Sequence, residues 1–204
     1  MIVVPRVTTP LPMEVIPDLI EGAFHVLGTR ITPAQKVNLA SLVAIETDRG
    51  KSIQNGNVGN ISAPPSYTGK VWRPPWFEVN ESSPASMLAL NRKMLDGKAP
   101  SAFRAYDSVQ VGAVDFARLL LSAPYAALMR AADGHDVDAF RRELARRYSP
   151  DYENAAVTRS LEKLRAELGG ASPGAGGAFA LVVVLLSLAW FGSGKPSRRR
   201  RVRR

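Results

Sequence analysis

The sequence predicts a mainly α-helical domain with a long irregular lobe at about residues 50–105, followed by one C-terminal transmembrane helix. Apolar residues recur at helical spacing on both sides of the lobe. The lobe itself loses this periodicity and is rich in Pro, Gly, Asn and Ser. The third observation is a stretch of 27 residues, 168–194, that contains no charged side chain. We therefore expect a folded domain, a Gly-rich linker, a transmembrane helix and a basic tail, at residues 1–168, 169–177, 178–194 and 195–204.

The composition limits what the domain can be. A chain of 204 residues fits one globular domain with a short appendage. The formal net charge is +9, but residues 195–204 hold seven basic groups and no acid, so the remainder carries only +2. Such a nearly neutral body excludes a broad nucleic-acid-binding surface on the domain. Without cysteine and with only two histidines, the chain has no disulfide, no thiolate metal site and no multi-histidine metal centre, and no cofactor is expected.

The helices are expected on either side of the irregular lobe. They are predicted at residues 13–27, 33–48, 109–121, 124–132, 137–147 and 150–168. Thr32 precedes Pro33 and lies three residues before Gln35, which is the pattern of a capping box. The helix that follows is apolar on nearly every face, so we expect it to run through the core and to be ended by Gly50.

The uncharged stretch near the C-terminus has the length of a membrane span. Residues 174–194 would extend about 30 Å as a helix, which matches the hydrocarbon core of a bilayer. Trp190 and Phe191 lie where interfacial aromatic residues are common, and the Arg-rich tail follows directly. The alternative is a buried C-terminal helix of the domain. The tail, residues 195–204, is expected to contact nucleic acid or anionic lipid without sequence specificity.

Glu46 is the candidate catalytic residue on physical grounds. It ends a helix whose preceding four residues, Leu42 to Ile45, are apolar. Partial desolvation and the negative end of the helix dipole should both raise the pKa of its carboxyl. A carboxylic acid that stays protonated near neutral pH is what cleavage of a glycosidic bond requires. The alternative is a helix-end glutamate paired with Arg49 or Lys51 and without catalytic function.

Two blocks of sequence resemble the glucosaminidase family of peptidoglycan hydrolases found in bacteria and phages. The first runs Ala-Ile-Glu-Thr-Asp-Arg-Gly over residues 44–50 and continues to Asn-Val-Gly-Asn-Ile at residues 57–61. The second is Phe-Arg-Ala-Tyr-Asp-Ser at residues 103–108. A later stretch, from Asp138 through Tyr148 to Tyr152, resembles the closing helices of the family, so the similarity covers roughly residues 30–165. It implies a lysozyme-like, mostly helical fold with a cleft between two lobes, and it assigns the general acid to Glu46.

The resemblance also suggests residues that bind the sugar. Tyr106 matches a tyrosine thought to steady the reacting sugar, although a core aromatic is the alternative. Asn57, Gly59 and Asn60 are expected to form a tight turn whose amides bind sugar, or alternatively a purely structural turn. Three loop aromatics are candidates for stacking on sugar rings, with simple packing of the loop as the alternative: Tyr67, Trp72 and Trp76.

A hydrolase of this family is expected to recruit a second carboxylate from the irregular lobe to activate water. The candidates are Glu78, Glu81 and Asp96, of which Glu78 is best placed by spacing. If none of them reaches the sugar, a lytic transglycosylase mechanism becomes preferable, since one acid then suffices. The Gly-Leu-Met-Gln segment typical of many transglycosylases is missing. Hydrolysis is therefore the leading expectation.

These observations predict a membrane-anchored glycosidase that cleaves peptidoglycan, of the endo-β-N-acetylglucosaminidase or muramidase type. Residues 1–12 lack the basic start and apolar run of a secretory signal. We therefore expect the protein in the virion of a phage with an internal membrane, with capsid proteins as partners, or in the host cell envelope. The alternatives are a catalytically inactive structural or sugar-binding virion protein and a cellular tail-anchored remodelling enzyme.

Overall fold

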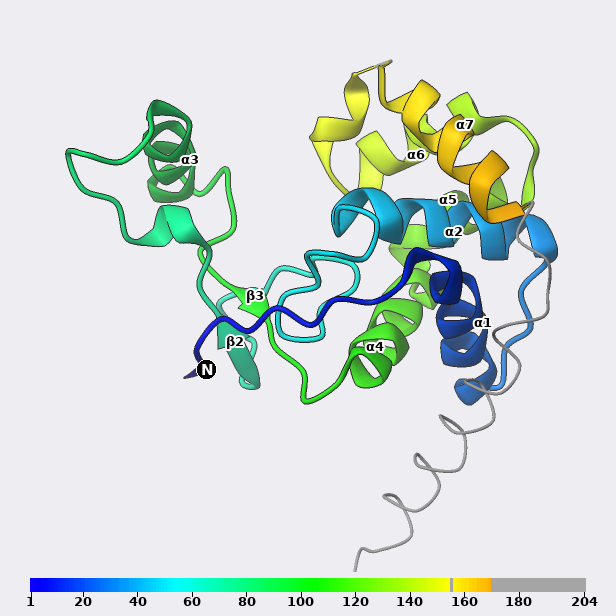
Figure 1. Cartoon of the computed structure of the whole chain (residues 1–204), viewed down its shortest axis with the longest axis horizontal. Coiled ribbons are helices and arrows are strands. Elements are labelled where there is room, and N and C mark those ends of the chain that lie inside the picture. Colours follow the sequence, from blue (N-terminus) through cyan, green and yellow to red (C-terminus); the bar gives the residue numbers. More distant parts are fainter. Residues whose placement is uncertain (155, 170–204) are drawn as a thin grey trace, which may run out of the picture.

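The computed structural model describes residues 1–154 and 156–169, which fold into a mainly helical structure with a small sheet (Figure 1). The α-helices are α1 (Ile16–Val26), α2 (Pro33–Glu46), α3 (Ala85–Leu95), α4 (Val109–Leu121), α5 (Ala126–Asp133), α6 (Val137–Arg147) and α7 (Ala156–Gly169). Short 3-10 helices are η1 (Met13–Val15), η2 (Pro75–Phe77), η3 (Ala123–Tyr125) and η4 (Pro150–Glu153). The strands are β1 (Ile2–Val3), β2 (Lys70–Trp72) and β3 (Phe103–Arg104), in the order β1-β2-β3.

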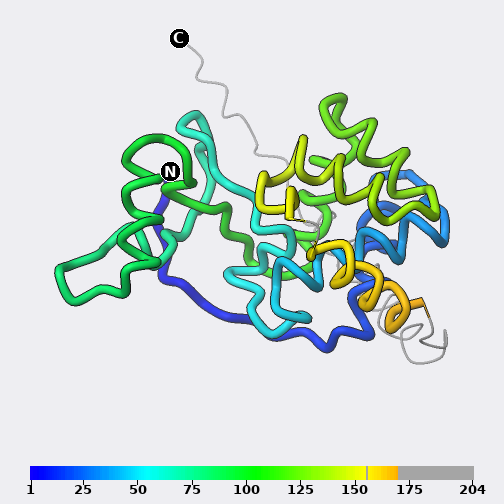
Figure 2. Tube along the Cα trace, turned by 90° about the horizontal axis from the view of Figure 1, so that it is seen from above, coloured from blue at the N-terminus to red at the C-terminus, as the bar shows by residue number. Residues whose placement is uncertain are grey.

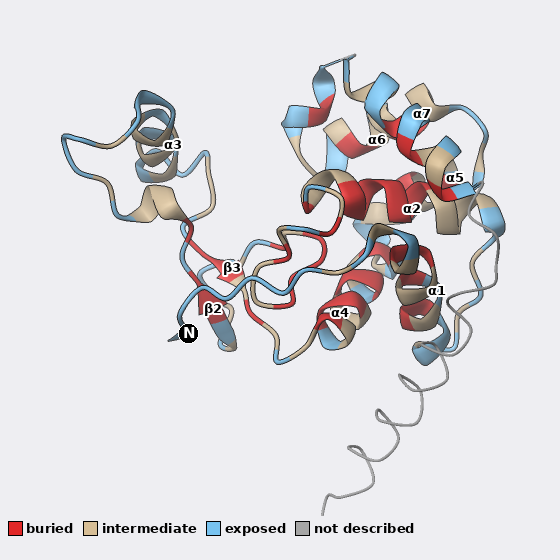
Figure 3. Ribbon diagram, in the orientation of Figure 1, coloured by how far each residue is buried: buried red, intermediate tan, exposed pale blue. Residues whose placement is uncertain are grey.

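Helix α2 is the centre of the helical body, which consists of α1, α2 and α4 to α7. Its seven consecutive residues from Asn38 to Ala44 are all buried, and it packs against α1, α5 and α7. Figure 3 shows this continuous burial along the middle of the body. The expectation that this helix runs through the core is confirmed, because an apolar surface on every face must be covered on every side.

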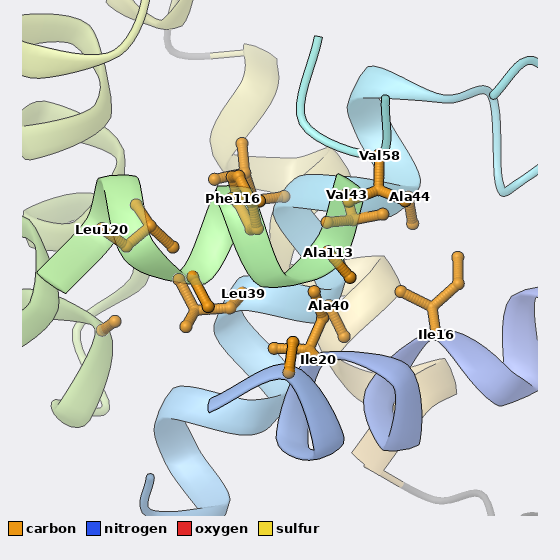
Figure 4. Close-up of a cluster of buried hydrophobic side chains, with 14 of the residues drawn as sticks. Ile16, Ile20, Leu39, Ala40, Val43, Ala44, Val58, Ala113, Phe116 and Leu120 are labelled. Atoms are coloured by element: carbon orange, nitrogen blue, oxygen red, sulfur yellow. The ribbon is translucent and has the colours of Figure 1, made fainter. Parts of the chain in front are cut away.

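The core around α2 brings together side chains from the helices and from the loop that follows α2. Leu39, Ala40 and Val43 of α2 belong to the same cluster of buried side chains as Phe116 of α4 (Figure 4). Ile53, Val58 and Ile61 from the loop are also buried in this cluster. The loop after α2 is therefore anchored by its own apolar side chains and is held against α4.

The predicted start of α2 is confirmed, and several predicted ends are corrected. Thr32 accepts a hydrogen bond from the Gln35 backbone, and the Gln35 side chain accepts one from the Thr32 backbone, at 3.1 and 3.0 Å. The helix ends at Glu46 rather than at residue 48, because Asp48 and Arg49 adopt left-handed backbone angles. The helix predicted at 150–168 is divided into η4 and α7, since Asn154 has an extended conformation.

The segment predicted to be irregular contains regular structure. Strand β2 pairs in parallel with β1 at the N-terminus and antiparallel with β3, and α3 packs on η2. We call residues 62–102 the small lobe. Figure 1 shows α3 standing apart from the helical body, and Figure 2 shows the same separation from above. Helix α3 consists largely of good helix formers, but the residues on either side of it have no helical periodicity. The spacing of apolar residues alone therefore did not predict this helix.

Within the part of the chain that the structure describes, no single helix is both long and apolar enough to cross a membrane. Two consecutive helical segments are long and apolar enough only when they are taken together. They are Val109–Leu121 and Ala123–Asp133, and the angle between them is 74°. The predicted transmembrane helix at residues 178–194 lies outside the described residues. The same is true of the linker from residue 170 onward and of the basic tail.

Gly112 in α4 allows the loop after α2 to approach the helix closely. A Cβ at this position would overlap the Gly56 carbonyl oxygen and lie 3.0 Å from the Tyr106 ring. We expect Gly112→Ala to lower the free energy of unfolding by about 1–3 kcal/mol, because the loop must be displaced. Urea unfolding of the full chain, followed by circular dichroism, measures this change.

The matched control is Gly22→Ala in α1, where an added Cβ meets nothing within 4 Å. Here alanine should raise the free energy of unfolding by about 0.5–1 kcal/mol, because it favours the helix more than glycine does. Equal effects of the two substitutions would show that the close contact at Gly112 is not part of the folded protein.

Candidate active site

Glu46 occupies the last turn of α2, at the point where the chain reverses. The Thr47 hydroxyl donates a hydrogen bond to the Val43 carbonyl at 2.7 Å, and the Arg49 backbone donates to the Ala44 carbonyl at 2.7 Å. These bonds satisfy carbonyl groups that the end of a helix would otherwise leave free. The reversal leaves the Glu46 side chain partly exposed at the edge of the helical body.

The turn after Glu46 depends on glycine at position 50. Gly50 has a φ of 86°, and a Cβ there would overlap the Leu11 carbonyl oxygen. Its backbone N–H donates to the Thr47 hydroxyl at 3.0 Å, and its carbonyl accepts from the Leu11 backbone at 2.9 Å. These contacts hold the N-terminal segment against the turn, and a side chain at position 50 would push the two segments apart.

The carboxylate of Glu46 accepts hydrogen bonds from two other segments of the chain. The Tyr152 hydroxyl in η4 donates to Oε1 at 2.6 Å, and the Asn60 amide donates to Oε2 at 3.0 Å. The same amide group also donates to the Glu46 backbone carbonyl at 2.7 Å. Helix α2, the loop after it and η4 thus meet at one acidic side chain.

The pKa of Glu46 is raised above its ordinary value. Burial is the largest cause, and the negative charge of Asp151 adds to it. The hydrogen bonds from Tyr152 and Asn60 act in the opposite direction, because they stabilise the ionised carboxylate. The direction expected from the sequence therefore holds, with burial as its main origin. A partly exposed carboxyl with a raised pKa is suited to donating a proton.

The turn that carries Asn60 is held by Asn57 and Gly59. Asn57 is fully buried. Its side-chain amide donates a hydrogen bond to the Ile61 carbonyl and accepts one from the Ile61 backbone N–H, and it also donates to the Arg104 carbonyl at 3.0 Å. With those bonds made, Asn57 has no exposed group for the predicted sugar contact, so its role in this structure is to hold the turn. Gly59 is also internal, since a Cβ there would overlap the Phe116 ring. Asn60 alone of the three reaches Glu46.

Tyr106 lies near this turn and is fixed at both ends. Its backbone N–H donates to the Asn55 carbonyl at 2.8 Å, and its hydroxyl donates to Asp115 at 2.7 Å. Burial and the bond to Asp115 raise the pKa of its hydroxyl well above the ordinary value, so it stays protonated. Tyr106 remains partly exposed, as a sugar contact requires, and that contact stays a prediction.

The predicted aromatic residues take different positions in the small lobe. Trp72 is in strand β2, is 5% exposed, and stacks on Phe103 at a centroid distance of 5.0 Å. It is therefore a core residue of the lobe rather than an exposed loop aromatic. Trp76 is half-buried and packs edge-on against Phe103, and its indole donates to the Pro100 carbonyl. The half-buried Tyr67 ring lies 4.9 Å from the Arg104 guanidinium carbon.

The predicted second carboxylates are all exposed side chains of the small lobe. Glu78 follows η2, Glu81 precedes α3, and Asp96 ends α3, where it pairs with Lys98. In the described ranges no hydrogen bond or ion pair links any of the three to Glu46 or to a residue bonded to it. The carboxylate whose charge acts on Glu46 is Asp151, which is exposed in η4.

Three residues of this site were not assigned a site role from the sequence. They are Tyr148, Asp151 and Tyr152 in the Tyr-Ser-Pro-Asp-Tyr segment at residues 148–152. Tyr148 donates a hydrogen bond to the Gly59 carbonyl, and its ring packs edge-on against Tyr152. The available signal was the density of tyrosines beside a predicted helix start at Pro150. No local pattern could show that this segment meets Glu46, which lies 106 residues before Tyr152.

The site as described is free of a metal-binding cluster. Across residues 1–154 and 156–169, no group of three or more His, Cys, Asp or Glu side chains is placed to hold a metal ion. The chemistry that these side chains offer is proton transfer by Glu46, assisted by hydrogen bonds from tyrosine and asparagine.

Comparison with known proteins gives a structural likeness. No protein-family model matches the chain, and no similar curated protein is found. Among solved structures, the chain resembles a peptidoglycan hydrolase mutant from Sphingomonas sp. A1 with a TM-score of 0.46 and 23% sequence identity. The match covers 85% of this chain and 96% of that one.

The two influences on the Glu46 pKa can be separated by substitution. We expect Asp151→Asn to lower this pKa, because a negative charge that disfavours ionisation is removed. We expect Tyr152→Phe to raise it further, because the carboxylate loses a hydrogen bond. Titration of the full chain with carbon-13-labelled glutamate, followed by NMR, measures both shifts.

The Glu46 signal in that titration is identified as the one missing from Glu46→Gln. Asp107→Asn is the control for a surface charge change, since Asp107 is exposed and pairs with Lys70. Shifts in the same direction for Asp151→Asn and Tyr152→Phe would contradict the assignment of these roles.

Proposed function

We propose that the chain is a glycosidase that cleaves the glycan strands of peptidoglycan, with Glu46 as the general acid. The observation that carries the proposal is the partly exposed Glu46 carboxyl, held between Tyr152 and Asn60 with a raised pKa. The resemblance of residues 44–50, 57–61 and 103–108 to the glucosaminidase family supplies the substrate class. The bond cut is then of the β-N-acetylglucosaminidase or muramidase type.

In this reaction the protonated Glu46 gives its proton to the glycosidic oxygen while the bond from that oxygen to the anomeric carbon breaks. The proton must be present at the start, which a raised pKa favours near neutral pH. In hydrolysis, water adds its oxygen to the anomeric carbon and loses a proton to a base. The Tyr152 and Asn60 hydrogen bonds stabilise the Glu46 carboxylate that remains.

A lytic transglycosylase is the second candidate, and the position of the carboxylates favours it. Glu78, Glu81 and Asp96 are exposed on the small lobe, and Asp151 is the carboxylate that acts on Glu46. In this mechanism the sugar's own 6-hydroxyl attacks the anomeric carbon and its proton passes to the Glu46 carboxylate. One acidic residue then suffices, and the product is an anhydro sugar.

Glu46→Gln tests the role of the acid. Glutamine cannot donate a proton in this way, so the rate at which the full chain clears a peptidoglycan suspension should fall at least about a hundredfold. The thermal unfolding midpoint should stay nearly unchanged. Glu162→Gln, an exposed position on α7, makes the same chemical change away from the site and should clear the suspension at the wild-type rate.

The products distinguish the remaining alternatives. Mass spectrometry of the digest should detect a new reducing sugar if the reaction is hydrolysis, and the identity of that sugar reports which linkage is cut. An anhydro product would assign a lytic transglycosylase. Undiminished clearing by Glu46→Gln would remove Glu46 as the acid. If the wild-type chain clears no type of wall, a structural or sugar-binding protein is the better description.

The proposal includes a membrane anchor formed by residues 178–194. The support is the composition of this segment, which is apolar and is followed by the seven basic residues of the tail. We further propose that the protein is carried in the virion of a phage with an internal membrane, where the tail contacts packaged nucleic acid or anionic lipid, beside capsid proteins.

Fractionation tests the anchor. The full chain should sediment with the membranes of expressing cells and should resist extraction by high salt, whereas a chain that ends at residue 177 should not sediment. Release of the full chain by salt alone would indicate binding by the basic tail without an anchor. Recovery of the protein only from the cytosol of infected cells, never from purified particles, would contradict the virion assignment.

A further inference from the structure

Asp115 links Tyr106 and Arg104 in a compact polar group beside the candidate site. Its Oδ2 accepts a hydrogen bond from the Tyr106 hydroxyl and another from the Arg104 guanidinium, each at 2.7 Å. The Arg104 and Asp115 side chains are only 20% and 18% exposed. On its other side, the guanidinium faces the Tyr67 ring. The group is therefore well packed, and its hydrogen bonds have little freedom to rearrange.

The bond between Tyr106 and Asp115 has a fixed polarity. A carboxylate paired with a guanidinium offers only acceptor atoms. The Tyr106 hydroxyl has one proton, so this proton must point at Asp115. What remains on the Tyr106 oxygen is the capacity to accept a hydrogen bond. A molecule that meets this oxygen must supply an N–H or O–H donor.

The backbone ties this group to Glu46. Asn57 donates to the Arg104 carbonyl, and three residues later Asn60 donates to the Glu46 carboxylate. Tyr106 is bonded through its backbone to the same loop, at Asn55. The oxygen of Tyr106 is therefore held at a fixed place relative to the acid.

The other hydrogen-bonded tyrosines near Glu46 have the same polarity. Tyr148 donates its proton to the Gly59 carbonyl, and Tyr152 donates its proton to Glu46. The Tyr148 ring packs edge-on against Tyr152 and against Phe116, the residue that follows Asp115 in α4, so these groups lie in one neighbourhood. Each of these tyrosine hydroxyls donates its proton to another group of the protein. Its oxygen can therefore only accept a further hydrogen bond.

We propose that Arg104 and Asp115 are positioning residues that make Tyr106 an obligate hydrogen-bond acceptor for an amide N–H or hydroxyl of the sugar bound beside Glu46. The inference rests on the proposed function and adds a specificity rule to it. A sugar with a donor at this place is bound, and a sugar with only an acceptor there is rejected, since two acceptors cannot pair.

Asp115→Ala removes the acceptor that fixes this polarity. Because the Asp115 Oδ2 accepts from both Arg104 and Tyr106, its loss leaves the Tyr106 proton free to turn outward. Tyr106→Phe removes the hydroxyl but leaves the Arg104–Asp115 pair intact. Each change should lower kcat/KM for a peptidoglycan tetrasaccharide about threefold to tenfold, the value of one hydrogen bond. The matched control is Asp107→Ala, at an exposed aspartate, which should leave kcat/KM unchanged.

A double-mutant cycle separates positioning from a merely structural role. If Asp115 acts through Tyr106, then Asp115→Ala has no further effect on kcat/KM in the Tyr106→Phe background. The same loss in both backgrounds overturns the proposal. If Asp115→Ala does not fold, Arg104→Lys, which keeps the charge but loses the planar donor pair, is put through the same cycle.

Two further measurements keep this test independent of the proposed reaction. The cycle is repeated on the dissociation constant of the tetrasaccharide in the Glu46→Gln background, where no glycan is consumed. If the wild-type chain cleaves the glycan but the effects of the two substitutions are additive, the proposed function is retained and the inference is overturned. If the chain binds the glycan with coupled effects but does not cleave it, the inference is retained and the proposed function is overturned. If the chain neither cleaves nor binds the glycan, the function and the inference are both overturned. In carbon-13 tyrosine NMR without glycan, Asp115→Ala should move the Tyr106 signal, and an unchanged signal overturns the inference.

Discussion

Seven consecutive buried residues in α2 require neighbouring structure on every side of that helix, and the remainder of the body is arranged to supply it. Helices α1, α5 and α7 pack against it, and buried side chains of α4 and of the loop after α2 complete the same core. Because the helix is fixed all round, the position of its last residue is fixed as well. Glu46 thus lies where a rigid element reaches the protein surface.

The environment of Glu46 balances opposing effects on one proton. Burial and the charge of Asp151 favour the neutral acid, whereas Tyr152 and Asn60 favour the carboxylate. An acid catalyst must pass through both forms in each cycle, so neither form can be stabilised without regard to the other. The two hydrogen-bond donors come from segments that meet only in the folded chain, which couples the acidity of Glu46 to the integrity of the body.

How much the sequence could predict depended on how local the determining interactions are. The start of α2 depends on Thr32 and Gln35, three residues apart, and its burial follows from its own composition, so both were predicted correctly. Trp72 was expected in an exposed loop because its partner Phe103 is distant in sequence and the strand that contains it pairs with β1 at the N-terminus. Tyr152 and Asp151 were not assigned to the site for the same reason.

Helix α3 has no fully buried residue, in contrast to α2. The core of the body is complete without it, and its packing partner is the short η2. Opening or exchanging this helix would therefore expose little apolar surface and cost little folding free energy. Changes in the length and chemistry of this lobe would therefore leave the core of the body that holds Glu46 intact. Under the proposed function, one body can thus carry lobes that fit glycans of different composition.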